Sequence, residues 1–364
     1  MEGAEILQDI LFVSLFGGVI MLDVAAALYL LLRRGNAIAP EVTSPVRLRR
    51  WAAGFLLACA WSHVMWMFYA YHPSVTVYTI VCLLDLLMLI PSMTGVLLSM
   101  LQDRHRTVWP VFILLIPAFI LSTLCVIRRD SALFVPASIY IYALYTLLML
   151  VLFLAVRRYG RWLRDNYADL EHKEVWQSFL ILVVFLLFFV MYSSTTSESR
   201  ILIYLLQIDC ILIAVLLLWR VETLQQLSEP ASSAEEPADD AQKVSAAPDI
   251  RANIGPLLKK HCEEAQLYLQ HDLTLAYLAQ VIGTNRYYLS QHFAQQGITY
   301  NAYINGLRIQ HFVRLYHEAV AEQRNFTAQQ LAFESGFRSY STFSATFKQN
   351  METTVTAWMR GTQA

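Results

Sequence analysis

Two stretches near the C-terminal end of the chain, 273–293 and 326–347, repeat one order of residue types. Each has a threonine before a short apolar helical pattern, then a glycine, then a second helical pattern containing Tyr, Ser and Arg. Arginine, glutamine and serine side chains hydrogen-bond to base edges in the major groove of DNA. The repeat predicts two helix-turn-helix units that present such side chains to DNA.

The first helix of each predicted unit has a start signal and a small residue on its inner side. Thr274 and Thr327 are expected N-caps, and Gln330 is placed to complete a capping box with Thr327. Ala279 and Ala332 are small enough to let a second helix cross closely. These features predict short, closely packed helix pairs.

The turns and the second helices follow the same logic. Gly283 and Gly336 supply the positive φ that a tight turn between helices requires. Thr284 and Ser339 are expected to cap the second helices.

The second helices are expected to present one apolar and one polar face. The apolar pairs Leu289/Phe293 and Phe343/Phe347, spaced i and i+4, should anchor them to the core. Solvated arginines and core-packed tyrosines are the alternatives to DNA contact on the other face. The predicted DNA-binding residues are Arg286, Tyr287, Ser290, Gln291, Arg338, Tyr340, Ser341, Ser344 and Ala345.

A long helix is expected between the two units, over residues 300–319. Its length of about 30 Å could place two recognition helices about one DNA turn apart, near 34 Å. Arg308 and Arg314 lie on this helix, and we expect them to form salt bridges or phosphate contacts rather than contacts with bases.

The C-terminal region resembles the AraC/XylS family of transcription regulators over about 100 residues. The resemblance rests on residues 289–293, residues 297–304 leading to Arg308, and the stretch 336–348. It implies DNA binding through both second helices. Glu352 and Val355 stand where the family usually has Gly and Pro, and the soluble sugar-binding domain of many members is replaced here by apolar segments.

The rest of the chain is unusually apolar. Hydrophobic residues make up 57% of the sequence, and its mean hydropathy is +0.44, above the share of roughly 45 to 50% in soluble proteins. A spanning helix needs about 20 apolar residues. Seven segments are predicted to span a membrane: 10–32, 51–71, 77–101, 108–127, 134–156, 175–192 and 201–219.

Positive charge predicts the orientation of these spans, because Lys and Arg stay on the cytoplasmic side. One set of connections holds 13 Lys and Arg residues and the other holds 3. We expect a multi-pass protein of the inner membrane, with the N-terminus outside and the C-terminus in the cytoplasm. Its expected domains are 1–224, an acidic flexible linker at 225–250, and the DNA-binding domain at 251–364.

Four ionisable residues lie inside predicted spans: Asp23, His63, Asp85 and Asp209. Such residues are rare at membrane depth and usually face the interior of a bundle. We interpret His63, Asp85 and Asp209 as a sensor pocket for a small ligand, ion or proton. The alternative is a set of structural hydrogen bonds between helices.

The expected fold is all-α, a polytopic transmembrane bundle followed by a soluble double helix-turn-helix domain. Phosphate-loop, nucleophile-elbow and HExxH motifs do not occur, so we expect neither an enzyme nor a cofactor or metal site. The predicted function is a bacterial membrane-bound transcription regulator. The alternative is a membrane receptor or transporter-like protein with a regulatory helical tail. The expected partners are double-stranded DNA, the lipid bilayer, RNA polymerase, a second copy of the chain in a homodimer, and an unidentified small ligand or ion.

Overall fold

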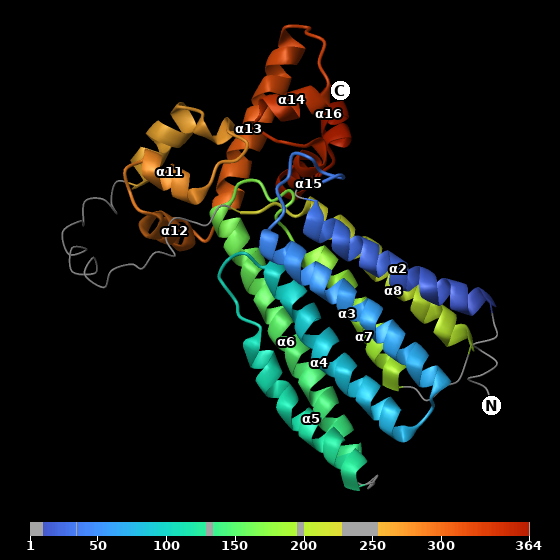
Figure 1. Ribbon diagram of the computed structural model, residues 1–364. Helices are drawn as coiled ribbons and strands as arrows, with labels where there is room; N and C mark the ends of the chain where they lie inside the picture. The colour runs from blue at the N-terminus through green and yellow to red at the C-terminus, as the bar shows by residue number, and fades with distance from the viewer. Residues whose placement is uncertain (1–9, 34, 129–133, 195–199, 228–253, 364) are drawn as a thin grey trace, which may run out of the picture. The chain divides into compact units, whose positions relative to one another are not determined.

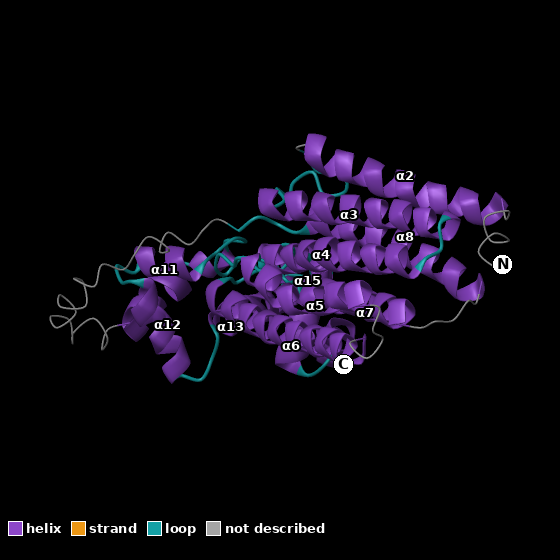
Figure 2. Cartoon of the chain, turned by 60° about the horizontal axis from the view of Figure 1, so that its bottom comes forward, coloured by secondary structure: helices purple, strands orange, loops and turns teal. Residues whose placement is uncertain are grey.

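The computed structural model describes residues 10–33, 35–128, 134–194, 200–227 and 254–363. Apart from one isolated β-bridge, the regular secondary structure of these residues is helical, as Figure 2 shows. The predicted all-α fold is confirmed. The chain forms two compact units: Met1–Gly160 with His172–Leu227, and Arg161–Glu171 with Ser228–Ala364.

Every predicted span corresponds to a helix. Most bounds agree within a few residues, but α6 continues well past the predicted end at Val156. The helices are α2 (Ile10–Leu32), α3 (Val46–Tyr71), α4 (Val75–Met100), α5 (Trp109–Arg128), α6 (Phe134–Asn166), α7 (Trp176–Ser194) and α8 (Arg200–Thr223), drawn from blue to yellow-green in Figure 1.

Five of these helices are long and apolar enough to cross a membrane, by length and composition: α2, α3, α4, Val135–Asn166 of α6 and Tyr204–Thr223 of α8. The apolar parts of α5 and α7 are shorter. Large apolar side chains also point outward, such as Ile116 on α5 and Val184 on α7, exposed by 52% and 55%. Helices that are apolar on all sides belong in a protein core or in lipid.

Polar side chains fasten the connection between α2 and α3 to the end of α8. The carboxylate of Glu222 accepts hydrogen bonds from the backbone N–H groups of Ala37 and Ile38, both at 2.8 Å. Ser44 donates to the backbone oxygen of Val221 at 2.5 Å, and Asn36 donates to that of Glu222 at 2.9 Å. This connection is therefore a folded part of the first unit.

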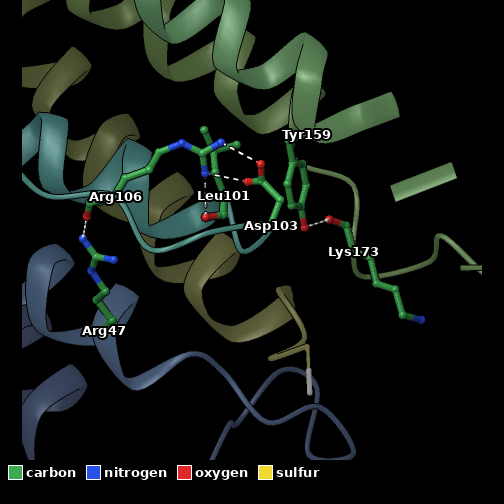
Figure 3. A network of polar contacts seen from close by, with 6 residues as sticks. All are labelled: Arg47, Leu101, Asp103, Arg106, Tyr159 and Lys173. Carbon is green, nitrogen blue, oxygen red and sulfur yellow. Dashed lines mark hydrogen bonds and ion pairs between the residues drawn. The ribbon is translucent and has the colours of Figure 1, made fainter. Parts of the chain in front are cut away.

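Further polar contacts involve the connection between α4 and α5 and the connection between α6 and α7, and Figure 3 shows them. Arg106 forms a two-bond ion pair with Asp103 at 2.5 and 2.8 Å. Arg47 donates to the backbone oxygen of Arg106. Tyr159 donates to the backbone oxygen of Lys173 at 3.1 Å. These residues belong to the connections that sequence analysis assigns to the cytoplasmic side.

The chain beyond α8 stays attached to the first unit as far as Leu227. The N–H groups of Gln225, Gln226 and Leu227 donate to His172 O, Thr43 O and Gln102 Oε1 at 2.9, 2.7 and 2.8 Å. α8 ends at Thr223, and these bonds hold the backbone of the next residues in a non-helical path. Residues 228–250 of the predicted linker lie outside the described residues.

Among its described residues after 270, the second unit contains six α-helices. A helical stretch at 254–258, a π-helix at Lys259–Glu264 and a 3-10 helix at Leu267–Leu269 precede them. The α-helices are α11 (Leu275–Val281), α12 (Arg286–Gln295), α13 (Tyr300–Ala321), α14 (Ala328–Glu334), α15 (Tyr340–Met351) and α16 (Val355–Gln363).

Two hydrophobic cores share α13. Its first half contributes Tyr300 and Ile304 to a core with α11 and α12. Its second half contributes Phe312 and Tyr316 to a core with α14, α15 and α16. In Figure 1, α13 lies between these two groups of helices. The predicted connecting helix is thus confirmed, with 22 residues.

Candidate nucleic-acid interface

The first helix-turn-helix unit consists of α11 and α12. The Thr274 side chain caps α11 by accepting from Tyr277 N at 3.2 Å. Gly283 has φ +73°, and the N–H of Thr284 donates to Ala279 O at 2.9 Å, which closes a Schellman turn. The predicted cap for α12 is one residue off: Asn285, not Thr284, accepts from Tyr288 N at 2.9 Å.

The second helix-turn-helix unit, α14 and α15, also has a threonine cap and a glycine turn. Its turn is one residue longer, because the α15 cap Ser339 follows Gly336 by three residues and the α12 cap Asn285 follows Gly283 by two. Thr327 caps α14 by accepting from Gln330 N at 3.1 Å, and Ser339 caps α15. Gly336 has φ +87° at the turn. The Gln330 side chain donates to Glu334 at 3.1 Å, so it reaches along the helix instead of back to the cap.

Both second helices turn their apolar residues inward. Leu289 and Phe293 on α12 are buried, as are Phe343 and Phe347 on α15. The opposite faces are therefore the ones available to a partner.

On α12 the four predicted contact residues lie outside the core. Tyr287 is 59% exposed, while Arg286, Ser290 and Gln291 are half-buried. Burial lowers the pKa of Arg286, and the nearby phenol of Tyr167 acts in the opposite direction. Tyr167, which lies outside the helix-turn-helix unit, is therefore close enough to Arg286 to act on it electrostatically.

The second helix-turn-helix unit differs from the first helix-turn-helix unit in the surroundings of Tyr340 and Arg338. Tyr340 packs against the second core, with its ring centroid 5.7 Å from that of Phe343. Arg338 lies 3.7 Å from the Asp272 carboxylate. Ser341 and Ala345 are exposed and Ser344 is half-buried.

Arg308 has a structural position that sequence analysis missed. It is 1% exposed and donates to Tyr268 O at 2.8 Å and Gln270 O at 2.7 Å, with its guanidinium 5.7 Å from the Phe337 ring centroid. Of the two expected contacts, a phosphate contact is excluded because the guanidinium is buried, whereas Asp169 and Asp272 are close enough to act on it electrostatically. Arg308 lies four residues after Ile304 and four before Phe312, which both belong to the cores. This spacing places Arg308 on the buried face of α13, and it could have been read from the sequence.

The closing turn forms although Glu352 stands where the resembled family usually has glycine. Glu352 adopts φ +55° at the end of α15, and Thr354 accepts from Ala357 N at 3.3 Å at the start of α16. Val355, at the usual proline position, is buried in the second core.

The predicted sensor residues lie in the compact unit of helices α2 to α8, where Asp85 and His63 have different partners. Trp66 donates to Asp85 at 2.7 Å, and His63 Nδ1 lies 2.8 Å from Cys59 O. Asp209 is 6% exposed, and one of its carboxylate oxygens has no hydrogen-bond partner among the described residues. Asp23 is more deeply buried, at 1% exposed.

Residues 278–361 match the family model of a helix-turn-helix domain, of the AraC type. The match begins in α11 and ends in α16, so it includes α12, α13, α14 and α15. No match was found among curated proteins or among solved structures.

Proposed function

We propose that this chain, whose C-terminal domain is an AraC-type helix-turn-helix DNA-binding domain, is a transcription regulator held in a membrane. In this proposal α12 and α15 enter successive major-groove segments of double-stranded DNA. RNA polymerase and a second copy of the chain are the proposed protein partners.

The observation that carries the DNA-binding mode is the pair of helices with one buried apolar face and one polar face. α13 joins them through 22 residues, or about 33 Å at a rise of 1.5 Å. This length is close to one turn of DNA, about 34 Å. Arg286 and Gln291 on α12, with Arg338 in the turn just before α15, are the side chains best suited to bidentate contacts with bases.

Membrane attachment is supported by the five helices long and apolar enough to span a bilayer. The excess of Lys and Arg in one set of connections favours a cytoplasmic C-terminus, where DNA is accessible. We therefore propose a multi-pass protein of the cytoplasmic membrane with its N-terminus outside.

We further propose that His63, Asp85 and Asp209 take part in sensing. Buried polar groups within a membrane bundle are costly and are often functional, and the partnerless oxygen of Asp209 could receive a ligand or a proton. Asp85→Asn and Asp209→Asn, made singly, keep the side-chain shape and remove the charge. Signal-dependent transcription should fall in either variant at an unchanged protein level, and an unchanged response in both would leave these residues structural.

DNA contact is tested by binding of the purified full-length protein in lipid nanodiscs to a genomic fragment selected by footprinting. Gln291→Ala should weaken specific binding by about 1 to 3 kcal/mol, because it removes contacts with a base edge. Gln280→Ala on the exposed side of α11 is the matched control. Equal losses for Gln291→Ala on specific and random DNA would show that it contacts no base.

A further inference from the structure

A short piece of chain from outside the matched domain is built into the first helix-turn-helix unit. Residues Arg161–Glu171 belong to the same compact unit as the C-terminal domain. Tyr167 pairs with Thr274 in an antiparallel β-bridge, and the N–H of Ala168 donates to Leu273 O at 3.2 Å. Such pairing is how an extended peptide adds to a folded domain through its backbone.

Two asparagines of α13 bind the same piece of chain from the other side. Asn301 donates to the backbone oxygens of Tyr167 and Ala168 at 3.2 and 2.7 Å. Asn305 also donates to Ala168 O, at 3.2 Å. The backbone of residues 167 and 168, named the docking segment here, is thus bonded on both sides.

The docking segment is inserted rather than laid on the surface. Ala168 is 1% exposed and is a member of the core that contains Leu273, Leu275 and Ile304. Asp169, which follows it, is 4% exposed and is close enough to Arg308 to act on it electrostatically. The Ala168 methyl group is buried in the core, and four hydrogen bonds hold the backbone of residues 167 and 168. Both features are typical of a specific docking site.

The docking segment also lies near the predicted DNA-binding helix α12. Thr274, its bridge partner, caps α11, and Tyr167 lies close enough to Arg286 to act on it electrostatically. Arg286 is the first residue of α12 and is half-buried. The docking segment thus lies near the first residue of the predicted recognition helix α12.

We propose that the docking segment is an inhibitory latch: bound, it holds Arg286 away from DNA, and its release from the first helix-turn-helix unit permits tight binding. The inference rests on the proposed function, because it requires Arg286 to contact DNA. The segment lies between α6 and α7 in sequence, in a connection assigned to the cytoplasmic side by its positive charge. A change in the membrane helices therefore has a direct covalent route to the DNA-binding face.

The test locks the latch covalently in the full-length protein in lipid nanodiscs. Opposed residues in an antiparallel pair have Cβ atoms about 4.5 to 5.5 Å apart, near enough for a disulfide after a small adjustment. Tyr167→Cys and Thr274→Cys are therefore combined, and affinity for a footprinted DNA fragment is measured in the oxidised and reduced states. Thr274→Cys removes the cap of α11 in both redox states, so the difference in DNA affinity between the two states does not include the effect of losing this cap.

Oxidation should form the crosslink and weaken DNA binding on the order of tenfold, within the usual range of coupling between sites, and reduction should restore it. The single variants control for the five native cysteines. Asn301→Ala, which removes two bonds to the segment, should tighten binding, whereas Gln310→Ala on the exposed side of α13 should not.

Failure to crosslink would overturn the docking, and a crosslinked protein with unchanged affinity would overturn the inhibition. Absence of specific DNA binding in both redox states and in the unsubstituted protein would instead refute the proposed function. The unsubstituted protein thus separates failure of the latch from failure of DNA binding.

Discussion

At the scale of single residues, the two turn glycines meet different surroundings. Both have positive φ, which costs other residues roughly 1–2 kcal/mol. A Cβ at Gly283 would meet no atom within 4 Å, whereas one at Gly336 would lie 2.8 Å from the backbone of Leu269. Gly336 therefore serves both as a turn and as a point of close backbone approach.

Gly283→Ala should reduce the free energy of unfolding by about 1–2 kcal/mol, from φ strain alone. Gly336→Ala should cost about 3 kcal/mol or more, because the overlap with Leu269 adds to that strain. Urea unfolding of residues 251–364 expressed alone is followed by the fluorescence of Trp358, the single tryptophan in this range. Similar losses in the two variants would contradict the close approach.

His311 predicts a pH dependence of the domain's stability. Its Nδ1 lies 2.8 Å from Arg314 Nη2 and 2.9 Å from the Tyr268 hydroxyl. A guanidinium can only donate, so Nδ1 must be unprotonated. Burial, followed by the charge of Arg314, lowers the pKa of His311, while Glu318 and Glu334 act in the opposite direction.

The unfolded state takes up a proton near pH 6.5, and the folded state does so only at lower pH. The stability contributed by neutral His311 is therefore complete above about pH 6.5 and is lost as pH falls through the folded pKa. His311→Asn should reduce the loss of unfolding free energy between about pH 7.5 and pH 5.5. His317→Asn, at an exposed site on the same helix, is the control, and identical pH profiles for His311→Asn and the unsubstituted protein would disprove the assignment.

At the scale of helices, α13 holds the C-terminal domain together. Its two halves lie in different cores, and Arg308 connects them by bonding to Tyr268 and Gln270 while lying near Phe337. A lysine ammonium is a point charge without a planar fork, so it cannot reproduce both bonds and the ring contact.

Arg308→Lys and Arg308→Met should each reduce the unfolding free energy by about 2–4 kcal/mol, because buried carbonyl groups lose their donors. Arg324→Lys is the control, since its 3.9 Å pair with Glu334 is exposed and worth about 0–1 kcal/mol. Urea titrations with Trp358 fluorescence measure the difference. A fully stable Arg308→Lys would show that charge alone suffices at this position.

Helix positions were largely predictable, because they follow from local patterns. Runs of apolar residues located α2 to α8, and Thr274, Thr327 and Ser339 marked helix starts through their own side chains. The cap of α12 was misplaced because Thr284 and Asn285 are adjacent residues that can both cap. The burial of Arg308 and the insertion of Ala168 depend on contacts between distant segments, which local periodicity does not encode.

At the scale of the whole molecule, the positive charges predict the topology. A reporter that is active only outside the cytoplasm should be inactive when fused after Leu227 and active when fused after Arg128, at the end of α5. Paired fusions to a reporter active only in the cytoplasm should give the opposite result. A reversed pattern would exclude DNA binding by the attached C-terminal domain, which would then lie in the wrong compartment.

The bonds of residues 225–227 to Thr43, Gln102 and His172 also bear on biosynthesis and on domain exchange. Because synthesis proceeds from the N-terminus, these are the last residues of the first unit to leave the ribosome, ahead of the DNA-binding domain. The bundle can thus be completed before that domain emerges. A chimaera should accordingly be joined after Leu227, since a junction at Thr223 would discard the residues that bind the earlier connections together.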